Sequence, residues 1–188
     1  IGLAWGVVGD SSPTGTADGD SLRTQGGAEG RRDEHPSVIG RFRIVRVLGA
    51  GYTGSGPILL AGLRWAVEQG YDVINMSLST TKSHFAGLLH EIADLAYFRR
   101  TVLVASAHNM PVESYPWRSS SVISVGSHEE PEAQTFYYNP SPPVEFFARG
   151  VDVEVAWLGG ARARSTGNSF ATPHVSGICA LILGKHPE

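Results

Sequence analysis

The sequence contains one cysteine, Cys179, among its 188 residues. A single thiol excludes an intrachain disulfide and a metal cluster held by paired cysteines. The cysteine content therefore does not indicate a cellular compartment, and we assign no localisation. No apolar run approaches the ~20 residues that span a bilayer, so we expect no membrane partner. The net charge is only −3 and the basic residues are scattered, so we expect no nucleic-acid partner. Nor does any acidic loop suggest a metal site or another cofactor.

Apolar side chains are also scarce between residues 9 and 37, where only Ala17, Leu22 and Ala28 occur among mostly polar residues and glycine. Such a segment buries too little apolar surface to offset the entropy lost on ordering it. We therefore expect loop or disorder there, which is unusual for so long a stretch of one compact domain.

From Phe42 onward the patterns of strands and helices alternate. Apolar and β-branched runs predict strands over residues 42–48, 71–78, 101–105 and 121–126. Helices are predicted from Pro57 to a stop at Gly70, from a cap at Ser83, and over about residues 169–185. This order predicts an α/β fold of three layers with a mostly parallel central sheet. Ligands of such sheets bind beyond the carboxyl ends of the strands.

The helical periodicity also predicts which side chains face the core. These are Ile58, Leu59, Leu63, Ala66 and Val67 on the first helix, Phe85, Leu88, Leu89, Ile92 and Leu95 on the second, and Phe170, Val175, Ile178, Leu181 and Ile182 on the last.

The segment that suggests a catalytic function is Gly167-Asn168-Ser169-Phe170-Ala171-Thr172-Pro173-His174. Ser169 stands at a predicted helix N-terminus, where free backbone amides and the positive end of the helix dipole can stabilise an oxyanion. A serine in this position is more commonly a helix cap. An α/β-hydrolase elbow is excluded, because Ala171 replaces its glycine and no Asp follows Ser169. If Ser169 is catalytic, its acid and base must lie upstream.

Residues 167–177 closely resemble the serine motif of the subtilisin-like serine peptidases (subtilases, peptidase family S8), with Asn168 in place of the usual Thr. Other segments resemble that family in the same order, and together they cover about residues 42–188. They are Arg46 to Gly49, Gly54 to Gly56, Asp72 to Leu78, Val102 to Asn109, Tyr115-Pro116 with Ser121 to Gly126, and Ala148 to Asp152.

The resemblance implies roles for several residues. Ser169 would attack the scissile carbonyl, and the Asn109 side chain would stabilise the oxyanion. Ser77, Leu78 and Ser79, together with Ala105, Ser106 and Ala107, would form the walls that bind an extended peptide. Two departures lie here: Ser79-Thr80 stands where glycines are common, and His108 replaces the glycine before the asparagine. The implied partner is a peptide or protein substrate, with a propeptide as a further candidate.

The family places its acid and base before these segments. Asp10, after Val7-Val8-Gly9, is the best match to the acid, although Ser12 stands where a glycine is expected. His35 is the one histidine upstream of Phe42; Pro36 follows it in place of a glycine, and too few residues remain for the usual helix. His84, His90, His128 and His186 match no motif, and His174 is expected to be structural.

Two functions therefore stay open. The first is a serine endopeptidase with Ser169, Asn109, Asp10 and His35; the second is a catalytically impaired pseudopeptidase that keeps the scaffold and at most binds peptide. In domain terms, we expect residues 1–41 to be a degenerate or partly disordered N-terminal part of the peptidase domain. Residues 42–188 are expected to be its catalytic core, truncated at the C-terminus.

Overall fold

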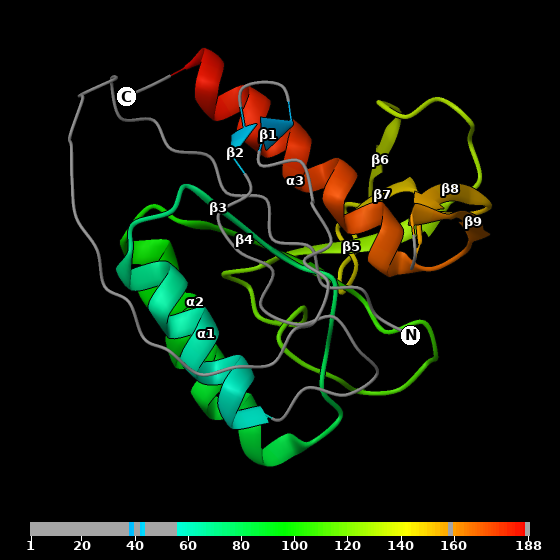
Figure 1. Ribbon diagram of the computed structural model, residues 1–188. Helices are drawn as coiled ribbons and strands as arrows, with labels where there is room; N and C mark the ends of the chain where they lie inside the picture. Colours follow the sequence, from blue (N-terminus) through cyan, green and yellow to red (C-terminus); the bar gives the residue numbers. More distant parts are fainter. Residues whose placement is uncertain (1–37, 40–41, 44–55, 158–159, 187–188) are drawn as a thin grey trace, which may run out of the picture.

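The computed structural model describes residues 38–39, 42–43, 56–157 and 160–186 (Figure 1). Apart from Val38 and Ile39, the predicted N-terminal part lies outside these residues. Strand β1 (Val38–Ile39) pairs antiparallel with β2 (Phe42–Arg43). Strand β2 holds the first two residues of the strand predicted over 42–48, and the remainder of that prediction falls outside the described residues.

A five-stranded sheet forms the centre of the fold, in the order β3-β4-β5-β7-β6. Strands β3 (Val73–Met76), β4 (Val102–Ser106), β5 (Ile123–His128) and β7 (Phe146–Arg149) run parallel. Strand β6 (Phe136–Tyr138) pairs antiparallel with β7 at one edge. The predicted, mostly parallel sheet is therefore confirmed, and its first strands are apolar because both faces are covered.

Helices cover both faces of this sheet (Figure 1). Helix α1 (Gly56–Glu68) and helix α2 (Ala86–Phe98), the latter preceded by the short 3-10 turn η1 (Ser83–Phe85), lie on one face. Helix α3 (Asn168–Lys185) lies on the other. Neighbouring residues of β4 enter different cores, because Leu103 packs with α1 and α2 whereas Val104 packs with α3. This arrangement confirms the three layers.

A hairpin of β8 (Val153–Ala156) and β9 (Arg162–Ser165) leads from the sheet to α3. Its side chains alternate between half-buried and exposed, and Arg162 and Arg164 point outward. The sequence patterns did not predict this hairpin, β6 or β7, since the hairpin alternates with charged residues and the other two strands are only three and four residues long.

Some predicted details were wrong. Ser83 does not cap α2, whose N-cap residue is Phe85 without a side-chain cap bond. Ile58 in the first turn of α1 is 65% exposed, and Leu181 and Ile182 near the end of α3 are 50% and 57% exposed. Leu88 lies beside the buried stripe of α2 and is 46% exposed. Periodicity identifies an apolar stripe, but it does not say where the neighbouring layer ends along the helix.

Within the described ranges, no helix is long and apolar enough to cross a membrane. In the same residues, no group of three His, Cys, Asp or Glu side chains is placed to hold a metal ion.

Candidate active site

Ser169 lies in the first turn of α3, immediately after the turn that follows β9. The Gly167 amide donates to the Gly150 carbonyl at 2.8 Å, which joins this turn to the end of β7. A Cβ on Gly150 would lie 2.6 Å from the Cβ of Ser127 and 2.9 Å from the Gly167 carbonyl oxygen. Position 150 therefore needs a glycine, because any side chain would push the serine turn away from the sheet.

The backbone of Ser169 is fixed from the opposite side by β3. The buried Ser77 hydroxyl donates to the Ser169 carbonyl oxygen at 2.8 Å, and Asn75 Nδ2 donates to the same hydroxyl at 3.0 Å. The Ser176 hydroxyl in turn donates to Asn75 Oδ1 at 2.8 Å. This chain of hydrogen bonds connects the end of β3 to α3 at Ser169 and again at Ser176, and such satisfied networks favour one geometry.

Asn168 connects the serine turn to two further strands. Its Oδ1 accepts from the amide and the hydroxyl of Ser127, both at 2.9 Å, while its Nδ2 donates to the carbonyls of Ala107 at 3.1 Å and His108 at 3.3 Å. A threonine has a single hydroxyl and could not make all four bonds. The departure from the family motif at this position thus produces a cross-link between the ends of β4 and β5.

Asn109 faces the same turn. Its Oδ1 accepts from the Asn168 amide at 2.9 Å, which also fixes which side-chain atom is oxygen. In the described part of the chain, no group accepts from Asn109 Nδ2, and the Ser169 amide donates to no group. Two hydrogen-bond donors beside one serine are thus available for a ligand oxygen, as an oxyanion site requires.

The predicted peptide-binding residues lie at the ends of β3 and β4 or directly after them. Ala105 and Ser106 are buried in β4, and Ala107 is buried directly after it. Beyond β3, Thr80 and Tyr115 exchange two backbone hydrogen bonds of 2.9 Å. Among the described residues, the amides of Leu78 and Ser79 donate to no backbone carbonyl. This segment therefore has backbone groups available to an extended peptide.

A cavity of about 500 Å³ adjoins Asn109 and Asn168. Its lining is largely apolar and comes from the loop after β4, the segment before β5, and the ends of β5 and β7. The lining residues are Ala107, His108, Asn109, Met110, Pro111, Val112, Glu113, Trp117, Arg118, Gly126, Ser127, Val144, Phe147 and Asn168.

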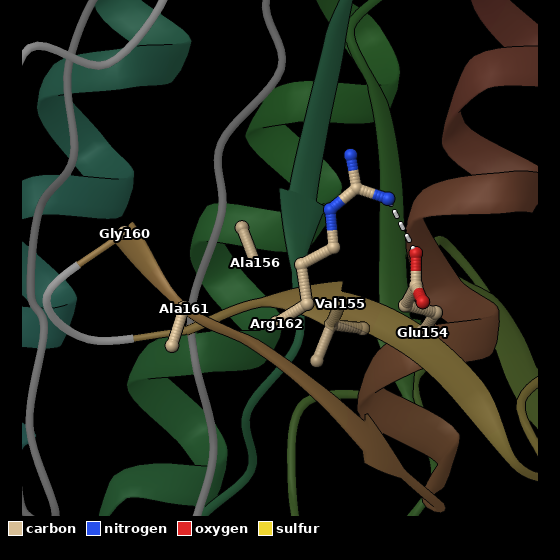
Figure 2. Close-up of a pocket in the computed structure, with 6 residues that line it drawn as sticks. All are labelled: Glu154, Val155, Ala156, Gly160, Ala161 and Arg162. Carbon is tan, nitrogen blue, oxygen red and sulfur yellow. Dashed lines mark hydrogen bonds and ion pairs between the residues drawn. The ribbon is translucent and has the colours of Figure 1, made fainter.

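A second hollow of about 340 Å³ lies on the β8–β9 hairpin and does not include the serine turn (Figure 2). Arg162 donates to Glu154 at 2.6 Å across it. Both partners are more than half exposed, so this ion pair contributes little to stability. The cavity beside Asn109 is the better candidate for substrate binding, because its lining includes Asn109, which carries one of the two unused donors, and Asn168, which precedes Ser169.

Among the described residues, no histidine forms a hydrogen bond with Ser169. His174, on α3, is half-buried, and its pKa is lowered mainly by burial and further by the Arg149 guanidinium. The His108 ring, which replaces a glycine, accepts the Met110 amide at 3.0 Å and so shapes the turn that carries Asn109. The predicted acid Asp10 and base His35 both lie outside the described residues.

Three contributors were missed by sequence reasoning. Asn168 was noted only as a departure from a motif, Ser77 only as a pocket wall, and Gly150 only as part of a matching segment. The pairing of Ser77 with Ser169 joins residues 92 positions apart. No local pattern signals such a contact, although a polar residue directly after an apolar strand was a usable hint.

Known proteins resemble this chain in both sequence and structure. A model of the subtilase family (peptidase S8) matches residues 30–188. Subtilisin DY of Bacillus licheniformis is 30% identical over 200 aligned positions, which cover 96% of this chain and 71% of that protein. M-protease of Shouchella clausii (strain KSM-K16) is 32% identical over 146 residues, which cover 77% of this chain but 38% of M-protease.

Solved structures show the same fold. The prenylagaramide maturation protease PagA superposes with a TM-score of 0.57 at 26% identity, over 72% of this chain and 51% of that one. The S41 psychrophilic protease has a TM-score of 0.59 at 22% identity, over 74% of this chain and 53% of that one. The chain thus spans about half the length of these solved relatives.

Proposed function

Because this chain belongs to the subtilase family of serine peptidases, we propose that it hydrolyses peptide bonds through an acyl-enzyme on Ser169. The observation that carries this proposal is the pair of unused donors, Asn109 Nδ2 and the Ser169 amide, on the turn that presents the serine. A helix N-terminus adds a favourable dipole at the same point.

The reaction starts with a peptide bound in extended form along residues 77–79. Ser169 Oγ attacks the carbonyl carbon, and the carbonyl oxygen becomes an anion that accepts from Asn109 and from the Ser169 amide. Collapse of this intermediate releases the amine and leaves an ester on Ser169. Water then attacks the ester and releases the carboxylic acid. Asn168 and Ser77 contribute by holding the serine turn, as positioning residues.

A serine hydroxyl is a weak nucleophile without a base. We assign the base to His35 and its orienting carboxylate to Asp10, from the sequence motifs alone. His35 would take the hydroxyl proton during attack and return it to the leaving amine. The His35→Ala variant is expected to lose hydrolysis while it keeps the same thermal unfolding profile. Hydrolysis that persists in this variant would require another base.

The substrate class follows from the cavity beside Asn109. Its Met110, Val112, Trp117 and Phe147 side chains provide an apolar lining, with Glu113 and Arg118 as its charged members. We propose that peptides with a bulky apolar side chain near the scissile bond are preferred, because burying such a side chain contributes roughly 1.5–3 kcal/mol.

The test is hydrolysis of a fluorescein-labelled casein by the full chain and by three variants. Ser169→Ala should reduce activity to background. Asn109→Ala should lower kcat about 100- to 1000-fold, a range taken from a member of this family and not worked out from this geometry. Asn139→Ala is the matched control, since Asn139 also fixes a loop through its side chain.

The possible results distinguish the proposed peptidase activity from the oxyanion role of Asn109. A folded wild-type chain without any hydrolysis would refute the proposed activity. Equal kcat values for Asn109→Ala and Asn139→Ala would refute the oxyanion role while leaving the nucleophile in place.

A further inference from the structure

A second group of serine, histidine and aspartate side chains lies on the α1–α2 side of the sheet. His90 and Asp94 are one turn apart on α2, and Ser119 belongs to the segment that precedes β5. His90 Nδ1 lies 2.9 Å from Ser119 Oγ, and His90 Nε2 lies 3.5 Å from Asp94 Oδ2. The mechanism proposed above uses none of these groups.

The three side chains are arranged as a nucleophile (Ser119), a base (His90) and an acid that orients the base (Asp94). The Asp94 carboxylate beside Nε2 favours the tautomer with its proton on that nitrogen, which leaves Nδ1 as the acceptor for the Ser119 hydroxyl. The Ser121 hydroxyl donates to Asp94 Oδ1 at 2.6 Å and so fixes the carboxylate. A serine within hydrogen-bond reach of a base that is itself oriented by a third group is the pattern of an activated nucleophile.

The backbone beside Ser119 supplies unused donors. The Ser119 amide donates to the Pro116 carbonyl at 2.9 Å, and the Val122 amide donates to the Ser119 carbonyl at 3.0 Å. Within the described ranges, the amides of Ser120 and Ser121 between them donate to no group. An amide directly after a nucleophilic serine is a common oxyanion donor in hydrolases.

We propose that Ser119, His90 and Asp94 form a second acylation site, independent of Ser169, for small activated carboxylic esters such as aryl acetates. The His90 and Asp94 side chains are 56% and 44% exposed. Because these groups are so exposed, we expect the site to accept only substrates with a good leaving group.

The chemistry balances without a further reactant. Ser119 Oγ bonds to the acyl carbon as its proton moves to His90 Nδ1, and the carbonyl oxygen becomes an anion near the Ser120 amide. The bond from the acyl carbon to the aryl oxygen then breaks and the phenolate leaves. His90 then gives up its proton to the departing phenolate or to solvent and is neutral again. It takes a proton from the water that attacks the ester on Ser119, and this proton returns to Ser119 Oγ as acetate leaves.

The same contacts would also hold the 116–122 segment on α2 without any reactivity, so the test must separate the two roles. His90→Gln keeps a side chain that can hydrogen bond to Ser119 but provides no base. His84→Gln removes an exposed histidine that stacks on Phe85, and it serves as the matched control.

The experiment is p-nitrophenyl acetate treatment of the full chain in a Ser169→Ala background, with acetylated residues mapped by peptide mass spectrometry. We expect acetyl-Ser119 in this background, no such adduct after Ser119→Ala, and about 100-fold slower formation after His90→Gln. His84→Gln should retain the Ser119 adduct and its rate of formation. Absence of acetyl-Ser119 from a folded Ser169→Ala protein, or an equal rate in His90→Gln and His84→Gln, would overturn the proposal. Since Ser169 is absent throughout, neither outcome depends on the peptidase activity.

Discussion

Replacement of Asn168 by alanine tests the link between the serine turn and the sheet. The change removes four side-chain hydrogen bonds, to the amide and hydroxyl of Ser127 and to the carbonyls of Ala107 and His108. A hydrogen bond contributes about 1 kcal/mol net, and water can replace part of this at a half-buried site. We therefore expect the free energy of unfolding to fall by about 2–4 kcal/mol.

Asn139→Ala is the control for this change. Asn139 makes three side-chain hydrogen bonds, to Ser141 and Val144, in a more exposed loop. The expected loss is about 1–2 kcal/mol, because solvent reaches most of these groups. Urea unfolding followed by tryptophan fluorescence measures both values, provided that the slope of the free energy with urea is unchanged.

A kinetic measurement makes the prediction specific to the site. Asn168→Ala should slow the reaction of Ser169 with a fluorophosphonate about 10- to 100-fold, because the serine turn is no longer held in a fixed position relative to Asn109. Asn139→Ala should leave this rate unchanged. If the two variants lose the same stability and react at the same rate, Asn168 does not hold the serine turn.

Three further predictions use other parts of the fold. Gly150→Ala should destabilise the protein by about 1–3 kcal/mol, because its Cβ would overlap Ser127. Gly87→Ala on α2, where nothing lies within 4 Å of the new Cβ, should not destabilise it; equal losses in urea unfolding would contradict the packing argument. Burial lowers the pKa of His174. Below about pH 6.5 this histidine therefore binds a proton more readily in the unfolded chain than in the folded one. The thermal midpoint should therefore fall on acidification through that range and fall less in His174→Gln, and identical profiles would refute this. Burial raises the pKa of Cys179, so its thiol should react with a disulfide reagent far more slowly in the folded protein than in urea; equal rates would contradict the burial.

Much of the central sheet could be predicted because its strands are apolar on both faces. The apolar runs that contain β3, β4 and β5 were predicted as strands. The helix predicted to start at Ser169 begins within one residue of the start of α3. Strands β6, β7, β8 and β9 were missed, because Phe136–Tyr138 is exposed, Phe146–Arg149 is only four residues long, and the hairpin alternates with charged residues. Such segments become strands by pairing with another segment, and hydrophobic periodicity does not record that pairing.

The candidate site was only partly predictable for the same reason. Ser169 and Asn109 stand in segments with family-like motifs, so their residue types and order identified them. The supporting contacts of Asn168, Ser77 and Gly150 depend on where three strand ends meet in space. Likewise, His90 and Ser119 lie 29 positions apart, and only the packing of α2 against the segment before β5 brings them together.

The central claim is that Ser169 is an activated nucleophile. The most direct test treats the full chain with a fluorophosphonate probe and maps the labelled serine by mass spectrometry, beside Ser169→Ala as a control. The account predicts rapid labelling of Ser169 that disappears in Ser169→Ala, where only slower labelling of Ser119 remains. A folded wild-type chain whose Ser169 stays unlabelled would contradict it.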